Sequence, residues 1–268
     1  LQWIQADPGA ASSWAPATPL HDALAVSDGV VNLAGEPIAE QRWTTQHLET
    51  LEASRLCTTR HLVSAFATLA KPPSVLVNAS AVGYFGTSLD GRFEESSPAG
   101  QDFLSRLCQK WEQAAEEKPS ATRLVVLRIG IVLSSEGGAL AKMLPVFRAG
   151  FGGPIGSGQQ WMSWIERGDL CRIIQSSLET DSWSGVINAV APAPVTMAVF
   201  AGSLGRCLGR PSLLPVPGPM LQLLLGDGSK VVLEGQFVSS SRLEALGFNF
   251  LCPTLPVALD VATSSSNR

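Results

Sequence analysis

The chain has 268 residues, of which 45% are hydrophobic and 16% are charged, and this length is ample for a core in one large domain or in one domain with a small appendage. Its net charge is −4 and its basic residues are scattered, so a nucleic-acid-binding function is not indicated. Because no apolar run approaches the roughly 18 residues of a membrane span, we expect no transmembrane segment.

The cysteines and histidines do not have the spacing of metal ligands. The five cysteines are far apart without a C-x-x-C pair, and the three histidines are isolated. We therefore expect no metal site, and free thiols of the kind found in a reducing compartment.

Apolar runs of strand length alternate with apolar residues at helical spacing along most of the chain. The predicted strands comprise residues 29–35, 75–78, 123–130 and 185–190, and the predicted helices comprise residues 45–69, a segment capped by Asp102, 137–153 and 169–178. Such alternation is typical of a parallel sheet covered by helices. A stiff connection with four prolines, residues 211–219, then precedes a small final segment, so we predict two domains, 1–208 and 209–268.

The stretch from Leu76 to Gly86 is the first candidate for chemistry. Its apolar run stops at small residues that include Ser80, and Tyr84, the only tyrosine of the chain, follows. A buried parallel strand of this kind delivers polar groups to the carboxyl edge of an α/β sheet, where such folds bind ligands.

Motifs along nearly the whole chain resemble one family, the sugar-nucleotide-epimerase-like branch of the extended short-chain dehydrogenase/reductases. The chain is most similar to cyanobacterial and plastid members, and its end resembles that branch's small C-terminal domain of unknown function. The motifs are Val31-Asn-Leu-Ala-Gly-Glu36, Asn78-Ala-Ser-Ala-Val-Gly-Tyr-Phe-Gly86, Gly152-Gly-Pro-Ile-Gly-Ser-Gly158, Leu214-Pro-Val-Pro217 and Val232-Leu-Glu-Gly235.

The resemblance implies a Rossmann-like sheet that binds NADP(H). It places Leu33 and Ala34 against the adenosine and pyrophosphate of the cofactor, Arg55 on one of its phosphates, and Ile131 near the nicotinamide. Without the family, the interpretation of the three apolar residues would be packing at strand ends.

The glycine-rich phosphate-binding turn of the superfamily is not found in this sequence. Its glycines allow the backbone to approach the pyrophosphate at a helix N-terminus. We therefore expect that the first strand–helix unit is missing, either because the sequence is N-terminally incomplete or because this member has lost the unit.

The catalytic tyrosine–lysine pair of the superfamily is also changed. If Glu112 is the glutamate of the pattern Y-x-x-x-K-x-x-x-E, Leu104 and Cys108 occupy the tyrosine and lysine positions. The remaining candidates are Ser80, to hold a substrate oxygen, and Tyr84, to donate a proton. For these two residues, local hydrogen bonding and packing is the alternative interpretation.

Two functions from different classes follow from these residues. The first is an NADP-dependent oxidoreductase or epimerase of unknown substrate. The second is a non-catalytic subunit or scaffold that kept the fold and has protein partners in a larger assembly. The resemblance implies a chloroplast location, with the cytoplasm as the alternative. A serine hydrolase is disfavoured because no G-x-S-x-G motif surrounds Ser80.

Overall fold

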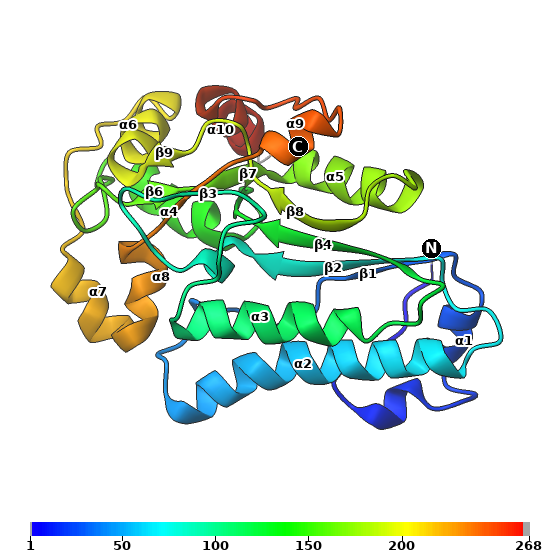
Figure 1. The fold of residues 1–268 in the computed structure, drawn as a ribbon. Coiled ribbons are helices and arrows are strands. Elements are labelled where there is room, and N and C mark those ends of the chain that lie inside the picture. The colour runs from blue at the N-terminus through cyan, green and yellow to red at the C-terminus, as the bar shows by residue number, and fades with distance from the viewer. Residues whose placement is uncertain (1, 265–268) are drawn as a thin grey trace.

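The computed structural model describes residues 2–264, and its centre is the parallel sheet that the sequence predicts (Figure 1). Strands β1 (Gly29–Asn32), β2 (Val75–Ala81), β4 (Arg123–Ile129) and β8 (Gly185–Ala189) are all parallel and lie in the order β1-β2-β4-β8. The register pairs Ser80 with Arg128 across the two central strands. The α/β fold expected from the alternation is therefore confirmed.

One face of the sheet is covered by two long helices, α2 (Thr45–Thr68) and α3 (Phe103–Glu116) (Figure 1). The short elements η1 (Ala11–Trp14) and α1 (Pro19–Ala25) complete this layer. Alternate residues of the strands point to it, because successive side chains of a strand face opposite sides. One buried cluster of this layer comprises Leu24, Leu62, Val63, Ala65, Phe66, Leu76, Ala115, Leu124 and Val126.

The opposite face is covered by α4 (Gly138–Arg148), α5 (Arg167–Glu179), α6 (Met197–Cys207) and α10 (Leu255–Ser264) (Figure 1). Their apolar faces share one core with the intervening strand residues, and this core holds the fully buried Trp164. The large apolar fraction of the sequence is accounted for in part by this double coverage of the sheet.

Short strands and helices lie outside the central sheet. Among residues 2–264, three further strand pairs form: β3 (Arg92–Phe93) with β10 (Phe237–Val238), β5 (Ile131–Leu133) with β7 (Trp164–Glu166), and β6 (Trp161–Met162) with β9 (Val195–Thr196). The remaining short elements are η2 (Val82–Phe85), α7 (Gly218–Leu225), η3 (Gly226–Ser229), α8 (Lys230–Leu233) and α9 (Ser241–Ala245).

The C-terminal segment is thus paired with a loop that precedes it by more than a hundred residues in the chain, since β10 lies beside β3. Strand β3 lies within residues 87–101, a stretch rich in glycine, serine and proline. The boundary at residues 208 and 209 stays a prediction. In the part of the chain that the structure describes, no helix is long and apolar enough to cross a membrane.

Candidate functional site

A cavity of about 710 Å³ lies at the carboxyl edge of the central strands. Its walls come from the end of β2, the junction of β4 and β5, one face of α3, the first half of α2, and the C-terminal segment 227–236. Most of the lining side chains are apolar or aromatic, and among them are Trp43, Phe103, Leu104, Leu107, Trp111 and Trp161. Polar and charged side chains also line it, among them Arg55, Ser80, Asp102, Arg106, Lys230 and Glu234. A concave site with apolar walls and placed polar groups is the usual form of a small-molecule site.

Three of the residues that we predict as site residues line this cavity, namely Ser80, Arg55 and Ile131. Of the described residues, Leu33, Ala34 and Tyr84 are not among those that line it. Leu33 is 54% exposed just after the end of β1. The structure therefore brings the serine, the arginine and the isoleucine together and leaves the other three outside the wall.

Arg55 is a buried cation without a carboxylate in contact. Its guanidinium donates to the backbone oxygens of Leu51 (3.1 Å) and Glu36 (2.9 Å), and it lies over the ring of Trp111 at 5.2 Å. No ion pair in the described part of the chain involves it. Burial lowers the pKa of Arg55, yet an arginine remains charged at neutral pH. A buried charge that faces a cavity favours an anionic ligand there.

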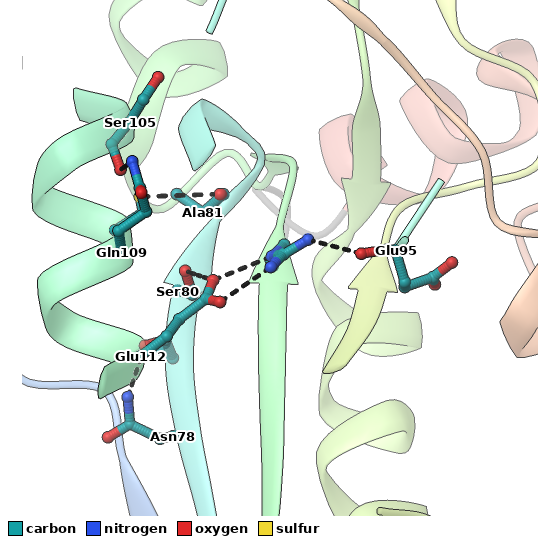
Figure 2. Close-up of polar contacts among 10 residues, drawn as sticks. Asn78, Ser80, Ala81, Glu95, Ser105, Gln109 and Glu112 are labelled. Atoms are coloured by element: carbon teal, nitrogen blue, oxygen red, sulfur yellow. Dashed lines mark hydrogen bonds and ion pairs between the residues drawn. The ribbon is translucent and has the colours of Figure 1, made fainter. Parts of the chain in front are cut away.

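Ser80 stands at the end of β2 and is connected to a buried ion pair. Its hydroxyl donates a hydrogen bond of 2.6 Å to Oε1 of Glu112, on α3 (Figure 2). Glu112 in turn receives two hydrogen bonds of 2.9 Å, one to each carboxylate oxygen, from Nε and Nη2 of Arg128. The side chains of this pair are only 4% and 12% exposed. Ser80 is thus held by a charged group that is itself fixed.

Tyr84 contacts the same arginine from another side. It lies in the turn η2, and the guanidinium carbon of Arg128 is 3.3 Å from the centre of its ring. Arg128 also donates to the backbone oxygen of Glu95 at 3.1 Å. The ring and the carbonyl together fix the plane of the guanidinium.

The register of α3 agrees with the alignment of the family motif. Leu104 and Cys108, at the tyrosine and lysine positions, both line the cavity, and Glu112 follows one turn later. Burial, followed by the charge of Glu112, raises the pKa of Cys108 to about 11. The thiol is therefore protonated at neutral pH, and a protonated thiol is a poor nucleophile.

The opposite wall of the cavity belongs to the C-terminal segment. Ser163 fastens this segment, because its hydroxyl donates to the backbone oxygen of Gln236 (2.8 Å) and accepts from the backbone N–H of Val238 (2.9 Å). A Cβ at Gly235 would lie 1.9 Å from the backbone oxygen of Trp161, so only glycine permits this approach. The segment is held against the sheet edge by the Ser163 side chain and by the close backbone contact at Gly235.

The glycine-rich loop 152–158 has a packing role. A Cβ at Gly152 would meet the ring of Phe147 at 2.4 Å, and one at Gly153 would meet the backbone of Leu214 at 2.2 Å. These close approaches explain the two glycines without a bound anion.

Sequence reasoning did not assign the roles of Glu112 and Arg128. A signal was present, because Arg128 is a charged residue inside an apolar strand and a buried charge requires a partner.

Among the described residues, no group of three or more histidine, cysteine, aspartate or glutamate side chains could hold a metal ion.

Comparison with known proteins gives consistent relatives. Residues 216–262 match a domain of unknown function, DUF1731. The chloroplastic epimerase family protein SDR39U1 homolog of Arabidopsis thaliana is 46% identical over 226 residues, which are 84% of this chain and 65% of that protein. The mouse epimerase family protein SDR39U1 is 43% identical over 240 residues, with 88% and 82% covered. This chain thus spans about two thirds of the plant relative.

Among solved structures, the human epimerase family protein SDR39U1, crystallised with NADPH, superimposes with a TM-score of 0.87. The two sequences are 40% identical, and the match covers 91% of this chain and 86% of the human chain.

Proposed function

The chain belongs to the epimerase family of the SDR39U1 proteins, and on this premise we propose that it binds NADP(H) in the cavity and acts there as an oxidoreductase or epimerase on a small molecule. The observation that carries the proposal is the buried Arg55, a cation without a carboxylate in contact, on the wall that also holds Ser80 and Ile131. When bound, the cofactor supplies or accepts a hydride.

In this proposal the residues of the chain bind, orient and exclude water. Arg55 holds a phosphate of the cofactor with its planar donors. Ile131 packs beside the nicotinamide, and Ser80 holds the oxygen of the substrate. The contribution of Leu33 and Ala34 to the adenosine and pyrophosphate site stays a prediction, since they lie outside the cavity wall.

The binding part of the proposal is tested by titrating the protein with NADPH and following the nucleotide fluorescence. We expect saturable binding, and in Arg55→Lys, which keeps the charge and loses the planar fork, at least about tenfold weaker binding. Arg60→Lys is the matched control, because Arg60 is exposed on the same helix. Absence of binding to the wild-type protein at high micromolar NADPH would contradict the proposal.

The role of Tyr84 as proton donor stays a prediction with its own test. Tyr84→Phe keeps the ring on Arg128 and removes the hydroxyl. Once turnover of a substrate is measured, a large loss of kcat in this variant supports proton donation, whereas an unchanged kcat supports a role of the ring in holding Arg128.

The second candidate is a non-catalytic subunit with protein partners. It is favoured by one observation, that Leu104 and Cys108 face the cavity where the superfamily has its tyrosine and lysine. A protein that binds NADPH as a monomer, without partners in a pull-down from plastid extract, would contradict this second candidate.

We also propose a plastid location, because the Arabidopsis relative is named chloroplastic. A fluorescent fusion of the full-length protein tests this.

A further inference from the structure

We infer that the cavity selects a ligand whose hydroxyl group donates a hydrogen bond to Ser80, because Glu112 and Arg128 hold the single proton of Ser80 away from the ligand. The inference rests on the proposed function in taking the cavity as the substrate site. It adds the chemical class of the substrate group that meets Ser80, an alcohol and not a carbonyl.

The direction of the Ser80 hydrogen bond is the first step. A serine hydroxyl has one proton to donate and two lone pairs to accept with. Ser80 gives that proton to Oε1 of Glu112 across 2.6 Å (Figure 2). A hydrogen bond from a hydroxyl to a carboxylate is charge-assisted, and its length is in the range of the strong ones.

The fixed position of Glu112 is the second step. Arg128 donates to both of its oxygens, and the side chains of Arg128 and Glu112 are only 4% and 12% exposed. Arg128 cannot turn away easily, because it is bound to the backbone oxygen of Glu95 and lies against the ring of Tyr84. If Ser80 turned its proton toward the cavity, a buried carboxylate would lose one of its hydrogen bonds, which is costly.

The surroundings of Ser80 are the third step. On the same wall, Leu104 is apolar, and the Cys108 thiol, a weak donor, points to the backbone oxygen of Ala81 at 3.8 Å. A carbonyl placed against Ser80 would bring two sets of lone pairs together, whereas a hydroxyl would complete the hydrogen bond.

The experiment compares cyclohexanol with cyclohexanone, which have nearly the same size and differ in the group that meets Ser80. Binding is followed by ligand-observed NMR and by the fluorescence of the cavity tryptophans Trp43, Trp111 and Trp161. We expect the wild-type protein to bind cyclohexanol about tenfold more tightly, the typical effect of an unpaired polar group. Ser80→Ala should bind both compounds with the affinity of cyclohexanone for the wild type.

Three variants separate this role from a loss of folding. Ser80→Thr keeps the hydroxyl and should keep the preference for cyclohexanol over cyclohexanone. Ser177→Ala removes another buried serine, on α5, whose hydroxyl bonds to the backbone oxygen of Ile173, and should also keep it. Glu112→Gln should narrow the preference by several-fold, because a neutral amide holds the Ser80 proton less strongly. Thermal unfolding of each variant verifies that it is folded.

The inference is overturned if the wild-type protein binds cyclohexanone as tightly as cyclohexanol, if it binds neither, or if Ser80→Ala retains the preference. An NADPH titration of the same samples keeps the two proposals apart. NADPH binding without an alcohol preference refutes only the inference, and an alcohol preference without NADPH binding refutes only the cofactor proposal.

Discussion

At the scale of single residues, the position of the Arg55 guanidinium depends on the absence of a side chain at Gly35. A Cβ at Gly35 would lie 2.9 Å from Cζ and 3.1 Å from Nε of Arg55, so the guanidinium rests directly on the backbone. Gly35→Ala should displace the guanidinium without removing any charge. We expect NADPH binding to weaken by about fivefold or more, since misplaced charge-assisted hydrogen bonds lose most of their strength.

The fluorescence titration that measures NADPH binding also measures this effect. Gly137→Ala is the control, because a Cβ at Gly137 meets nothing within 4 Å. Equal affinities of Gly35→Ala and the wild type would show that Arg55 does not need its present position to bind the nucleotide.

Cys108 gives a second prediction at the residue scale, about thiol reactivity and pH. Its pKa is raised from 9.0 to about 11, mainly by burial, so the thiolate fraction near neutral pH falls by about 100-fold relative to an ordinary thiol. The raised pKa means that the thiolate appears only as the pH approaches 11. Iodoacetamide at pH 7.5 should therefore modify the exposed Cys171 first and Cys108 very slowly.

Mass spectrometry of the peptides measures both rates. The rate at Cys108 should rise through the range from pH 9 to pH 11, and unfolding in urea should remove the difference between the cysteines. Equal labelling of Cys108 and Cys171 in the native protein at pH 7.5 would show that Cys108 is open to solvent.

At the scale of elements, Asp169 joins α5 to the segment that precedes α10. The sequence predicts a helix that begins at Asp169; in the structure Asp169 lies in the first turn of α5, and Glu166 caps the helix. The buried carboxylate of Asp169 also accepts from the backbone N–H groups of Leu251 (3.0 Å) and Cys252 (2.8 Å) and from Arg172. These long-range contacts could not be read from the local pattern.

Asp169→Asn should therefore destabilise the protein. An amide offers one acceptor oxygen where the carboxylate offers two, so one buried backbone N–H is left without a partner, at a cost of about 2 kcal/mol in the free energy of unfolding. Urea unfolding followed by circular dichroism measures the change. Asp181→Asn is the control, because Asp181 is fully exposed and 3.9 Å from Arg123, and it should stay within about 0.5 kcal/mol of the wild type.

The strands show which parts of the fold follow from local sequence. The runs that begin at Gly29, Val75, Arg123 and Gly185 were recognised because both faces of a parallel strand are buried and its residues are apolar throughout. The turn η2 was not recognised, and it decides that Tyr84 lies against Arg128 and not in the cavity wall. Such a turn depends on contacts between strands that are distant in sequence.

The candidate site divides in the same way. The end of an apolar strand indicates Ser80, and motif resemblance indicates Arg55 and Ile131; all three line one cavity. The link from Ser80 to Glu112 and Arg128 spans 32 and then 16 residues and depends on how α3 packs on the sheet. Periodicity assigns Glu112 to a helix but does not say which strand that helix faces, so the link required the structure.

At the scale of the whole molecule, the two predicted domains share one hydrophobic core. Strand residues such as Val77 and Leu127 belong to the same buried cluster as Phe248, Leu255 and Leu259 of the C-terminal part. Ser163 and the pairing of β10 with β3 add polar links between the two parts. A region whose apolar residues are buried only against its neighbour cannot keep that burial alone, so we expect it not to fold independently.

The last prediction is that the described chain unfolds as one cooperative unit. Urea unfolding followed by circular dichroism, which reports mainly on the long helices, and by hydrogen exchange of residues 241–262 should give coincident midpoints. NADPH at 100 times its Kd should raise the free energy of unfolding by about 2.7 kcal/mol, because the ligand binds only the native state. Both probes should report the same increase. In Arg55→Lys, at the same NADPH concentration, the shift should be smaller for both probes. If residues 241–262 exchange their amide hydrogens at a lower urea concentration than the one at which the helices unfold, the C-terminal part unfolds first. The boundary near residue 208 would then separate two independent folding units.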